Sequence, residues 1–170
     1  MKQLLIYSLI AIVFNSCGQT QHSPTTYPEH VGDITYDAAL DDKNFKICTN
    51  ETNIPQYYNF GKGLQYKGEK IAIDKYFEKN FKGKSQKNET GLLTIRFIVN
   101  CEGKTGRFRI EGMDSNYQLK KFDEALENQI LKLTKQMDGW IVGELQGQKL
   151  DYYQYLTFKL EGGQIIEIMP

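Results

Sequence analysis

The sequence predicts an α+β domain in which helices cover an antiparallel sheet. The clearest sign is an alternation of apolar and polar residues from Leu92 to Val99, which resumes after a turn at Phe108 and Ile110. Because successive side chains of a strand point to opposite faces, this stretch indicates a β-hairpin with one apolar face. Two segments with apolar residues three and four apart predict helices before and after it. The hairpin is not stable alone in water, so the other elements must cover its apolar face.

Two helices are expected. The first runs from Glu69 to Phe81, where Ile73, Phe77 and Phe81 recur at intervals of four. The second runs from about Leu119 to Met137 and ends at Asp138-Gly139, with glycine in the usual place after a helix. Trp140 follows it and is expected to pack the end of that helix onto the sheet. The residues expected to cap the second helix at its N-terminus are Asp114, Ser115 and Asn116.

The strands are placed by alternation and by turn residues. Asn100, Glu102 and Gly103 supply the hairpin turn, after which Phe108 and Ile110 are expected to face the core and Arg107 and Arg109 the solvent. A third strand is predicted from Tyr152 to Leu160, and Gly162-Gly163 predicts a two-residue turn into a last strand, 164–169. Residues 143–147 are expected to form a loop. Residues 31–55 are ambiguous, with a possible helical turn at 36–40 and a short strand at 45–48.

Charge and residue types argue against several function classes. Lys plus Arg equals Asp plus Glu, at 21 each, so no strong field favours nucleic acid. His22 and His30, the only two histidines, lie in or beside a polar N-terminal stretch, which leaves no Ser–His or Cys–His pair and no metal-ligand spacing. Asp41-Asp42 is expected to be a solvated turn. We therefore expect a protein that is not an enzyme and has no cofactor and no metal; an envelope hydrolase is the less favoured alternative.

The N-terminus reads as a targeting signal. Lys2 precedes an apolar run from Leu4 to Phe14, which is too short to span a membrane. The run ends in Phe14-Asn15-Ser16-Cys17-Gly18, which resembles the lipobox of a bacterial lipoprotein, and this resemblance implies that Cys17 is lipidated. The alternative is an ordinary cleaved signal. We expect a signal peptide at 1–17, a flexible tether at 18–33 and one domain with an N-terminal extension at 34–170, located outside the cytoplasm and anchored by lipid in the periplasm or outer membrane of a Gram-negative bacterium.

That compartment bears on the two remaining cysteines. Cys48 and Cys101 form an even remainder once Cys17 is assigned to lipid, and an oxidising compartment favours one disulfide between them. Such a bridge would tie the segment before the core to the hairpin turn. Two unpaired thiols are the alternative.

The central motifs resemble a known family. Residues 91–100 read G-L-L-T-I-R-F-I-V-N, and they are followed by Gly103, a long helix, Trp140 and a strand ending near Phe158. This order resembles the C-terminal domain of TonB over about residues 61–160. The resemblance implies two helices packed on one face of a three- to four-stranded antiparallel sheet, which pairs with a short extended peptide of an outer-membrane transporter. The Trp-x-Pro-Gly lettering of the family is Trp140-Ile141-Val142-Gly143 here. The chain also lacks the long proline-rich spacer and the transmembrane helix of TonB, having four prolines in all. A lipid-anchored binding protein is therefore expected in place of an energy transducer.

The expected mechanism is β-augmentation, in which a partner peptide from an envelope or outer-membrane protein adds to an exposed sheet edge. The edge is predicted at the last strand, or at the rim of the third strand, whose tyrosines could equally be ordinary residues of a half-buried pleated surface. A small-ligand cleft formed by Tyr57, Tyr58 and Tyr152 is an alternative. The residues predicted to line the partner-binding edge are Tyr153, Tyr155, Ile165, Ile166 and Ile168.

Overall fold

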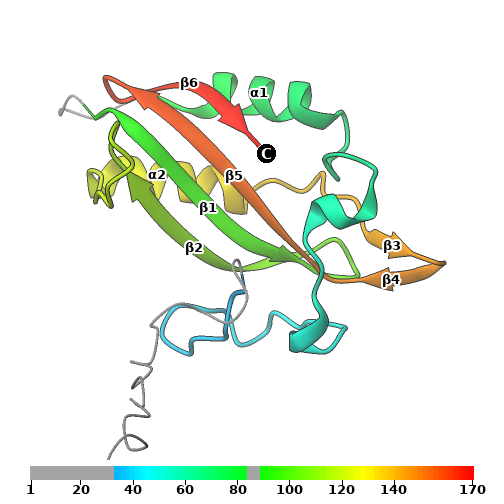
Figure 1. Ribbon diagram of the computed structural model, residues 1–170. Coiled ribbons are helices and arrows are strands. Elements are labelled where there is room, and N and C mark those ends of the chain that lie inside the picture. The colour runs from blue at the N-terminus through cyan, green and yellow to red at the C-terminus, as the bar shows by residue number, and fades with distance from the viewer. Residues whose placement is uncertain (1–32, 84–88) are drawn as a thin grey trace, which may run out of the picture. The chain divides into compact units, whose positions relative to one another are not determined.

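The structure, a computed structural model, describes residues 33–83 and 89–170 (Figure 1). The expected signal peptide, Cys17, both histidines and nearly all of the expected tether lie outside these residues. In the part that is described, no helix combines the length and the hydropathy needed to span a membrane. The elements in chain order are the short 3-10 helices η1 (Glu51–Asn53) and η2 (Tyr57–Phe60), α1 (Glu69–Asn80), β1 (Gly91–Val99), β2 (Thr105–Met113), α2 (Glu124–Lys135), β3 (Gly143–Leu145), β4 (Gln148–Leu150), β5 (Tyr152–Glu161) and β6 (Gln164–Met169).

Four strands form one antiparallel sheet in the order β2-β1-β5-β6. The expected turns connect them: Gly103 has φ +78° in the β1–β2 turn, and Gly162 and Gly163 have φ +58° and +77° between β5 and β6. β1 therefore lies inside the sheet and β2 and β6 lie at its two edges. The α+β class and the antiparallel sheet are confirmed.

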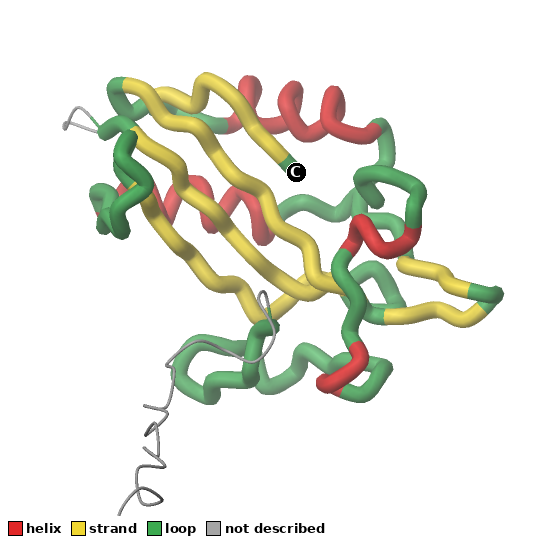
Figure 2. Tube along the Cα trace, in the orientation of Figure 1, coloured by secondary structure: helices red, strands yellow, loops and turns green. Residues whose placement is uncertain are grey.

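Both helices pack on the same face of this sheet and enclose the main core (Figures 1 and 2). The residues predicted to face inward on β1 are completely buried, as are Leu156, Phe158 and Leu160 of β5. From α1, Phe77 meets Phe158 with ring centroids 4.9 Å apart. Trp140 is buried and contacts Phe97 of β1 at 5.1 Å, as expected of a side chain that joins the end of α2 to the sheet.

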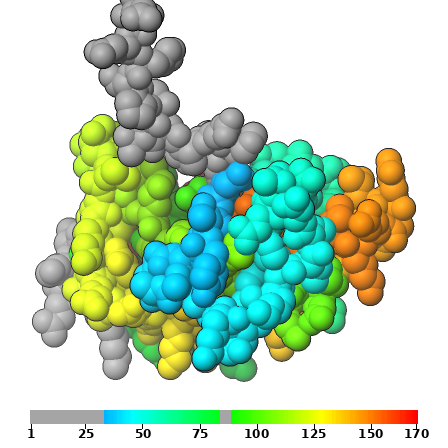
Figure 3. Space-filling view, turned by 90° about the horizontal axis from the view of Figure 1, so that it is seen from below, coloured from blue at the N-terminus to red at the C-terminus, as the bar shows by residue number. Residues whose placement is uncertain are grey.

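The opposite face of the sheet is partly covered by the N-terminal extension, residues 33–56. A second apolar cluster forms there from Ile34 and Ile54 of the extension, Ile98 of β1 and Tyr153 of β5. The Cys48–Cys101 disulfide, which the sequence favoured, joins the extension to the β1–β2 turn. Figure 3 shows the extension, in blue and cyan, as a large part of the surface on this side. A helical turn forms close to the expected 36–40, because the amides of Leu40 and Asp41 donate to the carbonyl of Asp37 at 3.1 and 2.8 Å, whereas the short strand possible at 45–48 does not form.

The second helix is shorter than its apolar spacing predicts. The expectation of a helix from Leu119 is wrong, because Leu119 forms a bridge with Met113 and the amide of Lys120 donates to the carbonyl of Gly112 at 2.9 Å. Leu119 is consequently 81% exposed. The helix begins after Asp123, whose carboxylate accepts hydrogen bonds from the amides of Ala125 and Leu126, so Asp123 is the N-cap in place of the residues at 114–116.

The expected loop at 143–147 is instead part of a small hairpin, β3–β4, which projects from one end of the main sheet (Figure 1). Its turn is made by Gln146 and Gly147, with φ of +53° and +80°. Both central residues of a tight hairpin turn take positive φ. A glutamine rarely occupies such a position, which is why the sequence did not indicate a turn here.

Candidate functional site

The last strand, β6, is an edge of the main sheet, as expected. It pairs with β5 alone, and its pairing contains an irregularity: Lys159 faces Glu167 and Leu160 faces Ile165, so Ile166 is an additional residue without a partner. This β-bulge shifts the alternation of side chains along β6. As a result, Ile165 and Ile168, which are three positions apart, both pack against the main core. Ile166 alone of the three isoleucines turns away from the core and is 54% exposed.

A groove of about 480 Å³ lies between β6 and α1. Its floor is apolar and is formed by Phe77 and Phe81 from the helix side and by isoleucines of β6. Lys70, Asp74 and Glu78 lie along one side of α1, at the helical spacings that bring residues onto a common face. The edge strand is therefore accompanied along its length by a helix wall and an apolar floor.

The other predicted edge residues, Tyr153 and Tyr155, belong to β5, which lies between β1 and β6. Both lie in the half of β5, Tyr152–Leu156, that β6 does not cover, where Gln56 forms an isolated bridge with Tyr153. β6 pairs with β5 only from Thr157 onward, and the amide of Tyr153 donates to the carbonyl of Pro55 at 2.9 Å. The carbonyl of Tyr155 accepts a hydrogen bond from the Gln154 side chain at 2.8 Å.

The opposite sheet edge, β2, is obstructed. Two residues of β2, Arg107 and Phe108, face the single residue Phe97 of β1, and Arg107 has φ +55° in this bulge. At the far end of β2, the segment that contains Leu119 and Lys120 already bonds to Gly112 and Met113. Bulges and covering segments are common ways of blocking strand addition.

The arginines of β2 hold the extension. Arg107 donates to Glu51 at 2.6 Å and to the carbonyl of Ile34, and Arg109 binds both carboxylate oxygens of Asp41 at 2.7 and 2.8 Å. The Asp41 side chain is only 2% exposed, so the expectation of a solvated turn is wrong for this residue. The hydrogen bonds from Arg109 lower the pKa of the Asp41 carboxyl. This pairing joins residues 68 positions apart in the chain and leaves no local signal in the sequence.

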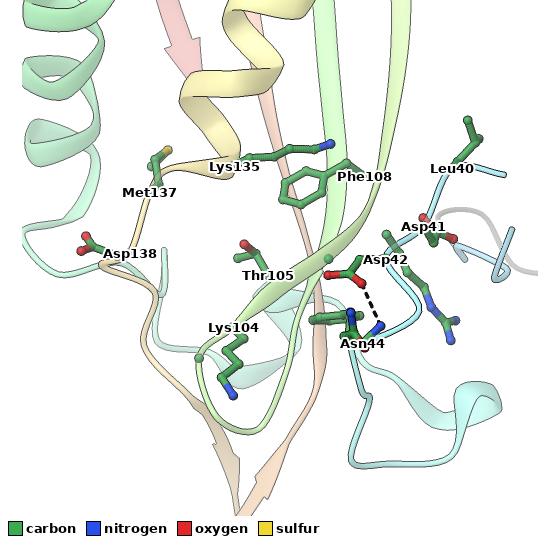
Figure 4. A pocket seen from close by; sticks show the side chains of 14 residues that line it. Leu40, Asp41, Asp42, Asn44, Lys104, Thr105, Phe108, Lys135, Met137 and Asp138 are labelled. Atoms are coloured by element: carbon green, nitrogen blue, oxygen red, sulfur yellow. Dashed lines mark hydrogen bonds between the residues drawn. The ribbon is translucent and has the colours of Figure 1, made fainter. Parts of the chain in front are cut away.

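A cleft of about 630 Å³ lies between the extension, the first half of β2 and the end of α2 (Figure 4). Phe108 forms part of its wall, and the ammonium of Lys135 lies 5.3 Å from the centroid of that ring. Most charged groups of the cleft are engaged within the protein: Asp41 with Arg109, and Lys104 with Glu102 at 2.6 Å. Asp42 accepts a hydrogen bond from the amide of Asn44, shown as the dashed line in Figure 4.

Only one group of Cys, His, Asp and Glu side chains within the described residues has ligand atoms close enough for a metal: Cys48, Cys101 and Asp151. The two sulfurs are bonded to each other. The buried Asp151 carboxylate accepts four hydrogen bonds of 2.6–2.8 Å, from the amides of Cys48, Thr49 and Cys101 and the hydroxyl of Thr49. The carboxylate thus anchors the disulfide and the extension to the start of β5, and its lone pairs are already used.

Of the tyrosines considered as a small-ligand cleft, Tyr152 belongs to the main core and Tyr57 packs against that core. Tyr152 is completely buried on the core side, and its hydroxyl donates to the carbonyl of Ile141 at 2.9 Å. Tyr57 and Tyr58 instead gather with Tyr155, with ring centroids 5.5 Å apart in each edge-to-face pair. Burial and a hydrogen bond with Tyr155 raise the pKa of Tyr57 to about 12. The ring partner of Tyr152 is Phe60, whereas Tyr57 contacts Tyr58 and Tyr155.

Comparison with known proteins adds no assignment, since no family model, no curated protein and no solved structure matches the chain.

Proposed function

We propose that this domain is a non-catalytic interaction module that binds an extended peptide of an envelope protein along the outer edge of β6. The observation that carries the proposal is the groove between β6 and α1, where the outer edge of the terminal strand adjoins an apolar floor. An added strand would obtain main-chain hydrogen bonds from the edge and side-chain contacts from the groove, which together give affinity and specificity.

The contrast between the two sheet edges supports β6 over β2. Strand addition to β2 meets a bulge at Arg107 and a paired segment at Gly112 and Met113. The bulge of β6 lies at Ile166, which shortens the regular edge but directs an apolar side chain outward. Bulges often re-aim side chains beside binding sites.

The remaining parts of the proposal rest on the sequence. The resemblance to the TonB C-terminal domain supports a peptide partner in the envelope, and the lipobox-like stretch supports an anchor at Cys17.

The anchor is tested by expressing Cys17→Ser beside the native chain and separating membranes from soluble material. Loss of membrane association and of lipid labelling in Cys17→Ser alone is expected. Retention of both would overturn the anchor without bearing on the groove.

The test of peptide binding is a photo-cross-linking residue placed at Ile166 in the full chain. The matched control is the same residue at Ile71, which is also an isoleucine, is 67% exposed on α1 and does not line the groove. We expect an adduct at Ile166 whose partner segment, mapped by mass spectrometry, competes with the cross-link when supplied as a synthetic peptide. Equal capture at both positions, or capture at neither by a folded protein, would contradict the proposal.

Small-ligand binding in the 630 Å³ cleft is a second candidate function, because this volume falls in the range of about 300–1,000 Å³ found for ligand sites. It is separable from the first, since the cleft contains no residue of β6. Chemical-shift changes confined to Phe108, Lys135 and the extension on addition of envelope extracts would favour it.

A further inference from the structure

The groove between β6 and α1 carries an excess of negative charge. Its lining contains one ammonium group, that of Lys70, and three carboxylates, those of Asp74, Glu78 and Glu167. Lys70 donates to Asp74 at 2.7 Å, so these two groups neutralise each other. Within the described part of the chain, neither Glu78 nor Glu167 makes an ion pair or a side-chain hydrogen bond.

The position of the two free carboxylates is informative. Glu78 comes from α1, on the core side of the sheet, whereas Glu167 pairs in register with Lys159 and lies on the other face of β6, so the two carboxylates stand on opposite sides of the strand edge. The whole chain has a formal net charge of zero, which makes this excess a local property of the groove. Other cations of α1, Lys75 and Lys79, do not line it.

The floor of the groove, on the core side of β6, is apolar. Phe77 and Ile168 are buried, and Phe81 and Ile165 are partly buried against the same core. A strand added to β6 would direct every second side chain toward this floor and the intervening ones away from it. An occupant matched to the groove thus needs apolar residues at most positions that face the floor, a positive charge on that side near Glu78, and a positive charge on the other side near Glu167.

We infer that the peptide bound along β6 is basic, an extended segment in which Lys or Arg side chains stand among alternating apolar residues and pair with Glu78 and Glu167. This inference rests on the proposed function, because it specifies the partner of the same groove. An acidic segment would place like charges beside two unpaired carboxylates and would be rejected. Exposed ion pairs are individually weak, so the two together favour a basic peptide over a neutral one by about 3- to 10-fold.

The test uses three labelled ten-residue peptides with alternating Val and Thr, in which one terminal Val position and one Thr position carry Lys, Gln or Glu, so that one charge lies on each face of the added strand. Fluorescence anisotropy with the full chain is expected to show the tightest binding for the Lys peptide, weaker binding for the Gln peptide and the weakest for the Glu peptide. The differences in affinity should decrease from 50 to 500 mM salt, because salt screens exposed charges. The double variant Glu78→Gln/Glu167→Gln is expected to bind all three equally, at the affinity of the Gln peptide. The control variant Glu124→Gln/Glu144→Gln makes the same change of net charge at exposed sites outside the groove and should keep the order.

The outcomes separate the inference from the proposed function. If the three peptides bind equally and displace the cross-link at Ile166, the groove accepts strands and the inference of a basic partner is overturned. The inference is also overturned if the order persists in Glu78→Gln/Glu167→Gln, since the preference then arises elsewhere. If no peptide binds and none competes at Ile166, strand addition at β6 fails and the inference fails with it.

Discussion

Removing the disulfide is expected to destabilise the domain without unfolding it. Cys48 and Cys101 are 53 residues apart, and the chain-entropy model assigns about 4 kcal/mol of stabilisation to a closed loop of this length. In Cys48→Ser/Cys101→Ser the main core loses no side chain, and three of the four donors to the Asp151 carboxylate are backbone amides, which the substitutions retain. The loss should therefore come from the greater freedom of the unfolded chain.

Urea unfolding of this variant and of the oxidised protein, both in a Cys17→Ser background, measures the effect. We expect the free energy of unfolding to fall by about 4 kcal/mol, with a larger m value because the unfolded chain expands. A reductant should lower the stability of the oxidised protein to that of the variant and leave the variant unchanged. A loss below about 1 kcal/mol would refute the reasoning, since it would mean that the bridge does not constrain the unfolded chain.

Three further predictions concern stability and titration. Arg109→Met leaves the Asp41 carboxylate without its partner and should cost about 2 kcal/mol in urea unfolding. Because Arg109 lowers the pKa of Asp41, the stabilisation by this ion pair is complete above about pH 4 and is lost as the pH falls through the lowered pKa. Below pH 4 the variant should therefore lose less stability than the native protein. Equal losses of unfolding free energy in the two proteins on acidification would contradict this. Phe77→Ala removes a buried ring in contact with Phe158 and should cost about 3–5 kcal/mol, whereas Ile71→Ala on the exposed side of α1 should cost less than about 0.5 kcal/mol by the same measurement. In an absorbance titration, Tyr57→Phe should remove one phenol that ionises near pH 12. Because the raised pKa means that the folded state favours the neutral phenol, the native protein should lose more stability than Tyr57→Phe between pH 10 and 12. An unchanged high-pH absorbance step in Tyr57→Phe would assign that ionisation to another tyrosine.

The hairpin and the first helix could be predicted because their signals are local and agree with the core they enter. On β1 the alternating residues from Leu93 to Val99 are buried as expected, and Ile73 and Phe77 are buried on α1. The turn glycines stand where positive φ is required, at Gly103 and at Gly162-Gly163. The edge position of Ile166 follows from the same alternation and chain order.

The second helix shows where this reasoning stops. Leu119 continues the apolar spacing of α2, yet hydrogen bonds to the end of β2 hold residues 118–120 in an extended segment. Phe122, also outside the helix, packs over Gly112, where an added Cβ would lie 2.8 Å from its ring. Such tertiary pairing outweighs a helix propensity that amounts to tenths of a kcal/mol for each residue.

The candidate site divides in the same way. The sequence identified the last strand as an edge, but not the groove beside it, because the groove forms only where α1, residues 69–80, comes beside residues 164–169. The bulge that exposes Ile166 and turns Ile165 and Ile168 to the same core is also a property of strand pairing. The unpaired state of Glu78 and Glu167 can be judged only when every potential partner has a position in space.

The sequence by itself determined the α+β class, the order of the main elements and the core faces of β1 and β5, and it favoured the pairing of Cys48 with Cys101. These features follow from the period of apolar residues, from turn chemistry and from the number of cysteines, all of which act over short stretches of chain or are simple counts. The tertiary structure alone decided that Asp41 pairs with Arg109, that the extension covers the second face of the sheet, and that a helix and an edge strand enclose an acidic groove. Those contacts join residues far apart in the chain, and their energies depend on distance and burial, which no local pattern encodes.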